Sequence, residues 1–351
     1  MKYRCTPEDF RVEEITSREF SSEKQKYSVY LLVKRGVETL ELLHRLAEIF
    51  DVTEKEIGIA GVKDKYALTK QFFTVPSQKQ PSSGIKDVTI THVGYTDKPL
   101  RLGDLIGNRF RMTVRDIEKG EIDGIIAKAA TVPLMGVPNY IDSQRFGSYL
   151  PSGFIAKKIL LGDLDEAISM AYGAANMDLP DSDFRAAYNK IPPRRREFFA
   201  SAYQSFLWNE CLKRLIRWNV DNKRLYTVDY KAGKMIFYKK ISDDEKVKLD
   251  IQIHMICDTL VEDDHERSII KKVLAAEGIK KEDMSSDKAS PIYFRPGERK
   301  AIVVPQEFSI TEPMLDDMYA REKRKRYMIT VSFTLPKGCY ATVVLKRIFN
   351  Q

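Results

Sequence analysis

Segments with the alternating pattern of β-strands lie towards both ends of this chain, and helix-rich sequence lies between them. Strand-like runs occur before about residue 150, as at 27–33 and 71–75, and again after about residue 300, as at 328–334. Between them, apolar residues recur at helical spacing, most clearly over 198–219. Because sheets and helices that are segregated along a chain form α+β folds or separate domains, this order predicts an α+β protein whose sheet is interrupted by a helical segment.

Several other segments carry weaker patterns. Helical spacing of apolar residues predicts a helix that ends near Phe50. Two glycines, a proline and an asparagine over 136–147 predict a structured loop. Residues 225–249 show little periodicity, and 312–327 favours a helix with a basic end. Branched and aromatic residues over 340–345 predict a last strand.

Composition favours a polyanionic partner and gives no sign of export. The chain has 351 residues, enough for two domains, and 58 basic against 50 acidic residues, a net charge of +8. Ordinary soluble proteins share such an excess, and each basic cluster, such as 194–196 or 321–326, can equally be a solvated face. The four cysteines form no Cys-x-x-Cys pair, so we expect no disulfide framework or zinc site and a reducing, cytoplasmic setting. No segment approaches the ~20 apolar residues of a membrane span, and the N-terminus lacks a signal peptide's apolar core.

The stretch 57–75 is the most specific part of the sequence. A short apolar run leads to Gly61, which allows a sharp turn, and the charges Lys63-Asp64-Lys65 follow before the next strand. An isolated triplet of this kind is usually a solvated loop tip. We expect the Asp64 carboxylate to be ionised, because neighbouring positive charge favours the charged form.

Its neighbours make the stretch distinctive: Ala60-Gly61-x-Lys63-Asp64-x-x-Ala67-x-Thr69-x-Gln71 resembles the central motif of the TruD family of tRNA pseudouridine synthases. Six further stretches resemble motifs of that family, in the family's order, although Ile141-Asp142 replaces its Phe-Gly. They are Pro7-Glu8-Asp9-Phe10, Gly107-Asn108-Arg109-Phe110, and residues 136–147, 201–209, 297–299 and 335–342.

The resemblance implies an architecture and an activity. The catalytic core would be a mixed, mainly antiparallel sheet with flanking helices, formed by residues 1–155 and 300–351, and 156–299 would be an inserted, helix-rich α/β domain. The activity would be conversion of uridine to pseudouridine in tRNA, at position 13 in the D-arm region. This isomerisation oxidises nothing and releases no group, so we expect no cofactor or metal, and no phosphate-binding glycine loop or Rossmann fingerprint is present. No membrane or obligate protein partner is indicated.

The resemblance also implies a set of site residues around one catalytic carboxylate. Asp64 would act on the ribose, and Arg4, at the position of a family lysine, would balance its charge. Substrate binding would fall to Phe10, Asn108, Phe110 and Tyr340. The candidates for RNA contact are Lys63, Lys65, Arg109, Arg111, Arg145, Arg194 and Arg195.

Two other functions fit the same residues. One is another RNA-acting enzyme with a single carboxylate, such as a glycosylase or nuclease. The other is a non-catalytic RNA-binding or tRNA-folding protein that retains the scaffold. Both roles of Asp64, as nucleophile at C1′ or as base on the ribose, also remain open at this point, as do the target tRNA and the oligomeric state.

Overall fold

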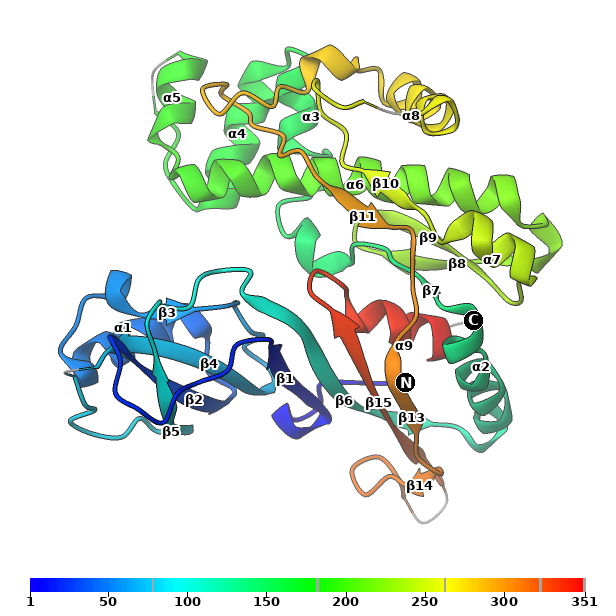
Figure 1. The fold of residues 1–351 in the computed structure, drawn as a ribbon. Helices are drawn as coiled ribbons and strands as arrows, with labels where there is room; N and C mark the ends of the chain where they lie inside the picture. Colours follow the sequence, from blue (N-terminus) through cyan, green and yellow to red (C-terminus); the bar gives the residue numbers. More distant parts are fainter. Residues whose placement is uncertain (78, 181–182, 262, 322–323, 350–351) are drawn as a thin grey trace. The chain divides into compact units, whose positions relative to one another are not determined.

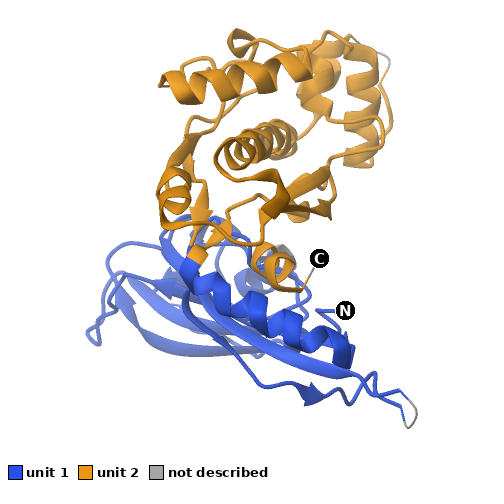
Figure 2. Ribbon diagram, turned by 90° about the vertical axis from the view of Figure 1, so that its right-hand side faces the viewer, with its two compact units in different colours: residues 1–134, 304–341 blue, residues 135–303, 342–351 orange. Residues whose placement is uncertain are grey.

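The computed structural model describes residues 1–77, 79–180, 183–261, 263–321 and 324–349, and the chain divides into two compact units (Figure 2). Unit 1 contains residues 1–134 and 304–341, and unit 2 contains residues 135–303 and 342–351. The sequence-based boundaries, 155/156 and 299/300, concern a catalytic and an inserted domain, and that assignment stays a prediction.

The elements of unit 1 are β1 (Phe10–Thr16), β2 (Tyr27–Arg35), α1 (Thr39–Phe50), β3 (Gly58–Ile59), β4 (Leu68–Pro76), β5 (Val88–Thr96), β6 (Leu105–Ile117), α2 (Ile122–Met135, whose last residue is counted in unit 2), β13 (Gln306–Ile310), β14 (Met314–Leu315) and β15 (Tyr327–Pro336).

The strands of unit 1 form one sheet in the order β13-β15-β6-β1-β4-β2-β5, with β14 paired to β15 and β3 to β4 (Figure 1). Strands β1 and β4 are parallel, and the other pairs are antiparallel. The predicted α+β class with a mixed, mainly antiparallel sheet is therefore confirmed.

Alternation along β6 gives the middle of the sheet two different faces. Phe110 and Met112 are buried, whereas Arg109 and Arg111 are exposed on the other side. Val12 of β1 and Phe333 of β15 lie opposite Phe110, so the apolar face continues across three strands. The same register places Glu14 opposite Asn108, and two polar residues therefore stand at one end of this face.

Helix α1 covers a second part of the sheet. Its Leu42, Leu46 and Phe50 are buried against Tyr30 and Phe73, whose rings stack with centroids 5.3 Å apart. This packing explains the helical spacing seen in the sequence, because the apolar stripe of an amphipathic helix faces the core.

The elements of unit 2 are β7 (Val137–Pro138), α3 (Ile155–Leu160), α4 (Leu164–Ala175), α5 (Phe184–Lys190), α6 (Pro193–Asn219), β8 (Leu225–Tyr230), β9 (Gly233–Tyr238), α7 (Asp243–Leu249), β10 (Gln252–His254), α8 (Asp264–Glu277), β11 (Glu298–Lys300), β12 (Ile302–Val303) and α9 (Ala341–Phe349, whose first residue is counted in unit 1).

Helix α6 is the longest of these elements and begins at Pro193, earlier than predicted, since proline is well tolerated in the first helical turn. Its Tyr203, Trp208 and Leu212 are completely buried. The helix therefore supplies much of the apolar core of unit 2.

Residues 225–249, which show little periodicity, fold into the β8–β9 hairpin and α7. Two of the weaker predictions are wrong. The described residues of 312–327 carry strand β14 and the first residue of β15 in place of a helix. The expected strand over 340–345 is the start of α9. Tertiary contacts favour that helix, because Thr342 and Lys346, one turn apart, both donate to the buried carboxylate of Asp142, the latter at 2.5 Å.

Gly58 lies too close to its neighbours to accept a side chain. A Cβ there would lie 2.5 Å from the carbonyl oxygen of Leu100 and would also meet the hydroxyl of Thr74. We expect Gly58→Ala to lower the free energy of unfolding by about 1–3 kcal/mol, measured by urea titration. At Gly84 a Cβ meets nothing within 4 Å, so Gly84→Ala should change stability by less than about 0.5 kcal/mol. Equal losses in the two variants would contradict the steric argument.

Candidate active site

Asp64 lies in unit 1, in the turn between β3 and β4, and forms an ion pair with Arg4. Arg4 Nη2 lies 3.2 Å from Asp64 Oδ2, with the two side chains 28% and 24% exposed. Such exposure leaves the carboxylate accessible to a ligand while a cation balances its charge. The structure thus brings together two residues that are 60 positions apart in the chain.

The geometry around Arg4 fixes its side chain closely. Its backbone has φ 63°, a left-handed conformation that residues with a Cβ seldom adopt. Paired backbone hydrogen bonds between Lys2 and Arg115, 2.9 and 2.7 Å long, hold the preceding residues against β6. The guanidinium carbon of Arg4 lies 4.2 Å above the ring of Phe10, close enough for a cation–π contact.

Three aromatic rings continue the site below Arg4. Phe10 meets Phe110 edge to face, with centroids 6.4 Å apart, and Phe110 packs on Phe333 at 5.6 Å. Phe10 is only 2% and Phe110 7% exposed. These rings therefore form an apolar floor with a small accessible edge and no fully open stacking face.

A buried polar group lies beside this floor. Lys63 Nζ lies 2.9 Å from Glu14 Oε2. The two groups form an ion pair, but their relative orientation is not that of a directed hydrogen bond. The same nitrogen donates to Asn108 Oδ1 at 2.6 Å. Lys63 was expected as an RNA contact, but its side chain is only 6% exposed, so it does not lie on the surface. Its charge is used internally, to compensate Glu14 and orient the amide of Asn108.

Two further side chains bind the backbone of the Asp64 turn from the opposite side. Lys34 Nζ donates to the carbonyl oxygens of Val37 at 2.7 Å, Asp64 at 2.8 Å and Lys63 at 3.4 Å. The hydroxyl of Thr39 donates to the Lys63 carbonyl at 2.9 Å and accepts from the Lys63 amide at 3.2 Å. Peptide groups on both sides of the Lys63 Cα are therefore bound to the start of α1 and the end of β2.

Our reading of the sequence missed Lys34, Thr39 and Glu14. The available signal was the alternation of the strands. Every second residue of β2, Tyr30, Leu32 and Lys34, lies on its buried side, and so do Phe10, Val12 and Glu14 of β1. A charged residue at a position where alternation requires an apolar one is a candidate for a buried polar contact.

The other predicted residues of unit 1 differ in their exposure. Lys65 is exposed and approaches the ring of Tyr66, itself 67% exposed. Arg109 and Arg111 are on the face of β6 opposite Phe110, and Arg109 pairs with Glu307 at 3.1 Å, which lowers the pKa of that carboxyl. Tyr340 is half-buried between β15 and α9.

The predicted residues of unit 2 occupy two places. Arg145 is half-buried in the short helix Ser143–Phe146. Arg194 and Arg195 are exposed in the first turn of α6, where Arg195 donates to the carbonyl of Ala174 at 3.2 Å.

Of the basic cluster 321–326, residues 322 and 323 lie outside the described part of the chain. Arg326 of that cluster is buried and pairs with Asp116 at 3.1 Å.

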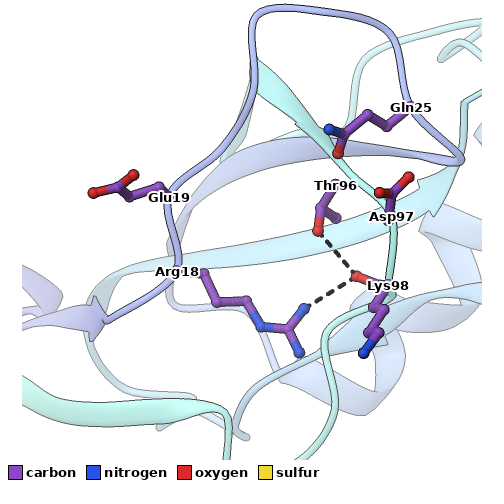
Figure 3. A pocket seen from close by; sticks show the side chains of 6 residues that line it. All are labelled: Arg18, Glu19, Gln25, Thr96, Asp97 and Lys98. Atoms are coloured by element: carbon purple, nitrogen blue, oxygen red, sulfur yellow. Dashed lines mark hydrogen bonds between the residues drawn. The ribbon is translucent and has the colours of Figure 1, made fainter.

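A surface hollow of about 430 Å³ is found elsewhere in unit 1 (Figure 3). It is lined by Arg18, Glu19, Gln25, Thr96, Asp97 and Lys98. Arg18 and Thr96 both donate to the carbonyl of Lys98, at 3.0 and 3.3 Å. No predicted site residue lines it.

Among the described residues there is no group of three or more His, Cys, Asp or Glu suited to a metal. No helix among them has both the length and the apolar character to cross a bilayer.

Comparison with known proteins connects this geometry to one family. The sequence model described as tRNA pseudouridine synthase D (TruD) matches residues 1–182 and 175–348. A protein named "Probable tRNA pseudouridine synthase D 1" from Methanococcus maripaludis is 32% identical over 100% of both chains. "Probable tRNA pseudouridine synthase D 2" from Methanocaldococcus jannaschii is also 32% identical, over 99% of this chain and 92% of its own. The solved structure from Methanosarcina mazei that carries the TruD name covers 100% of this chain and 93% of its own, with a TM-score of 0.69 at 23% identity, and so has the same fold.

The buried pair of Glu14 and Lys63 can be tested by a double-mutant cycle. Lys63→Met removes the cation that pairs with Glu14 and leaves that carboxylate buried and uncompensated. We therefore expect the free energy of unfolding to fall by about 3 kcal/mol. In Glu14→Gln/Lys63→Met the loss should be at least about 1 kcal/mol smaller than the sum of the single losses. Lys65→Met, a change to the exposed neighbour, is the control. Additive losses would show that the pair is not coupled.

Proposed function

Since the chain belongs to the TruD family of tRNA pseudouridine synthases, we propose that it isomerises uridine to pseudouridine in tRNA and that Asp64 is its catalytic carboxylate. The observation that carries the assignment of Asp64 is its partly exposed ion pair with Arg4 at 3.2 Å, next to Phe10. A carboxylate that acts on a sugar must be accessible and needs a cation to balance its charge, and the partly exposed pair with Arg4 supports both requirements.

The proposed reaction balances without a cofactor. The bond from C1′ to N1 of uracil breaks, the base turns while it stays bound, and C1′ bonds to C5. C5 loses a proton and N1 gains one, so substrate and product have the same composition. Asp64 either attacks C1′ as a nucleophile or removes a proton from the ribose, and in both cases the anion is the reactive form. Arg4 would keep that anion compensated once the bound nucleoside excludes water from it.

The uracil would be held by Asn108 and the nearby rings. Because Asn108 Oδ1 accepts from Lys63, its amide nitrogen is the group that can donate to a carbonyl of the base. Phe110, supported by Phe10, would form the floor under the uracil, and Tyr340 would supply the more accessible ring. The uridine must leave its stack to reach this site, which is the usual cost of chemistry on a base or its glycosidic bond.

We further propose that residues 1–155 and 300–351 form the catalytic domain and 156–299 an inserted domain that contacts tRNA, and that the target is uridine 13 in the D-arm region. Arg194 and Arg195 are the strongest candidates for phosphate contacts. They lie in the first turn of a 27-residue helix, where positive side chains are unfavourable next to the helix dipole unless an anion is present.

The catalytic assignment is tested with transcribed tRNA and carbodiimide-dependent primer extension. The wild-type protein should give one strong stop at a D-arm uridine. Asp64→Asn keeps the size of the side chain but removes the anion, so the stop should disappear, a loss of at least about 10³-fold in rate.

The matched control is Asp51→Asn, a change to an exposed carboxylate at the end of α1 that pairs only at the surface with Lys79. It should retain the wild-type rate. A stop with Asp64→Asn would refute the assignment. Chain cleavage or base loss in place of a mass-neutral product would indicate a nuclease or glycosylase, and an unmodified but refolded tRNA would indicate a non-catalytic RNA-binding protein.

The role of the α6 arginines is tested through salt dependence. Arg194→Gln/Arg195→Gln should weaken tRNA binding, measured by filter binding, and should reduce the slope of log K against log [salt] by about 1–2. The rate constant for bound tRNA should stay unchanged. Arg267→Gln, on the exposed side of α8 where Arg267 pairs with Asp264, is the control. An unchanged slope in the double variant would exclude these arginines from phosphate contact.

A further inference from the structure

The corner between β2 and α1 provides four hydrogen bonds to the backbone of Lys63 and Asp64. Two come from Lys34 Nζ, at 2.8 and 3.4 Å, and two involve the hydroxyl of Thr39, at 2.9 and 3.2 Å. Lys34 Nζ also binds the carbonyl of Val37, inside the corner itself. The corner and the Asp64 turn are thus joined by side chains that are both buried, Lys34 at 0% and Thr39 at 1% exposure.

A lysine in this position is costly. It occupies a position on β2 where the alternation calls for an apolar residue, at the end of the face that α1 covers. Within the described part of the chain, its ammonium group donates to three peptide carbonyls and to no carboxylate oxygen. Burial of a cation without a directly bound anion lowers stability, and a leucine or methionine would fill the same space without that cost. The lysine therefore points to a function that an apolar residue cannot supply.

The direction of its contacts indicates that function. The ammonium group binds the backbone carbonyl of Asp64, whose side chain forms the partly exposed pair with Arg4, and its positive charge interacts with the Asp64 carboxylate. Lys63, the other residue it binds, is anchored at its far end by Glu14 and Asn108. A turn held at both its backbone and its side chains can place a carboxylate with little freedom.

We propose that Lys34 and Thr39 are positioning residues, which fix the Lys63–Asp64 backbone so that the Asp64 carboxylate is aimed at the ribose. This inference rests on the proposed function, because it assigns these residues to the same reaction. Neither residue touches the substrate. Their loss should therefore lower the rate of the bound complex and leave tRNA affinity nearly unchanged.

The first test separates the hydrogen bonds of Thr39 from its shape. Thr39→Val keeps the size of the side chain and removes both bonds, so kcat for tRNA should fall by about 10- to 100-fold with KM within about twofold. Thr39→Ser keeps the hydroxyl and should restore kcat to within about threefold of wild type. The control is Thr74→Val, which removes a comparable buried bond, from the Leu100 amide at 3.0 Å, away from the Asp64 turn.

The second test uses the charge of Lys34. Burial is the main cause that lowers the pKa of Lys34 to about 8, with Lys63 acting in the same direction and Asp64 and Glu38 opposing it. The ammonium form is therefore present below pH 8 and is lost above it. The ratio of the wild-type single-turnover rate to that of Lys34→Met should be large at pH 7 and should decrease as pH rises through about 8. Titration of the uracil is common to both proteins and cancels in the ratio.

Stability gives an independent readout of the same group. Because the folded pKa lies below the usual value near 10.4, the unfolded chain binds more protons between about pH 8 and pH 10, and wild-type stability should rise with pH there relative to Lys34→Met. This shift is expected whatever the role of Lys34 in the reaction, so it verifies that Lys34 titrates as assumed.

The outcomes distinguish the inference from its premise. Wild-type kcat in both Thr39→Val and Lys34→Met would overturn it. The inference would also be overturned if kcat fell no more in Thr39→Val than in Thr74→Val, compared at matched melting temperature. A ratio of wild-type to Lys34→Met single-turnover rates that did not change with pH would overturn it as well. Activity in Asp64→Asn would instead refute the proposed function. If Lys34→Met does not fold, Thr39→Val with its serine rescue decides alone.

Discussion

The ion pair between Glu14 and Lys63 is the interaction on which the site in unit 1 depends. It joins β1 to the Asp64 turn on the buried face of the sheet, and through Asn108 it reaches β6. Buried pairs of this kind contribute little net stability, because desolvation of both charges offsets their attraction. Their value lies in geometry, because a movement of the turn that separated Lys63 from Glu14 would leave two buried charges without their partner.

Lys34 extends the same principle to the other side of the turn. Three charged residues, Glu14, Lys34 and Lys63, take positions that apolar residues would fill at lower cost. Local disagreement between a residue and its environment is expected where function competes with stability. All three contact, directly or through each other, the peptides of Lys63 and Asp64, while the core around Tyr30 and Phe50 follows the ordinary apolar pattern.

The sequence predicted elements well where the periodic signal and the tertiary environment agree. The sheet of unit 1 and helix α1 follow directly from alternation and from helical spacing, and the motif around residue 64 pointed to Asp64 and Arg4, which the structure places in contact. The run 340–345 was misread because its branched residues favour strands locally, whereas Asp142 selects the helix through Thr342 and Lys346. Lys63 was misread as a surface residue for a related reason, since its partner Glu14 lies 49 positions away and no local pattern links them.

The pairing of charges also bears on how RNA would be attracted. Several ion pairs of unit 1 match cations with carboxylates, as in Arg4 with Asp64, Lys63 with Glu14 and, on the exposed face of β6, Arg109 with Glu307. A matched pair attracts phosphate weakly, because the field of the cation is largely cancelled a few ångströms away. The net charge of +8 must therefore act through other side chains. The first turn of α6, with three consecutive arginines and no acidic residue, has the opposite character, so affinity for a polyanion and chemistry on the ribose would be carried by different parts of the chain.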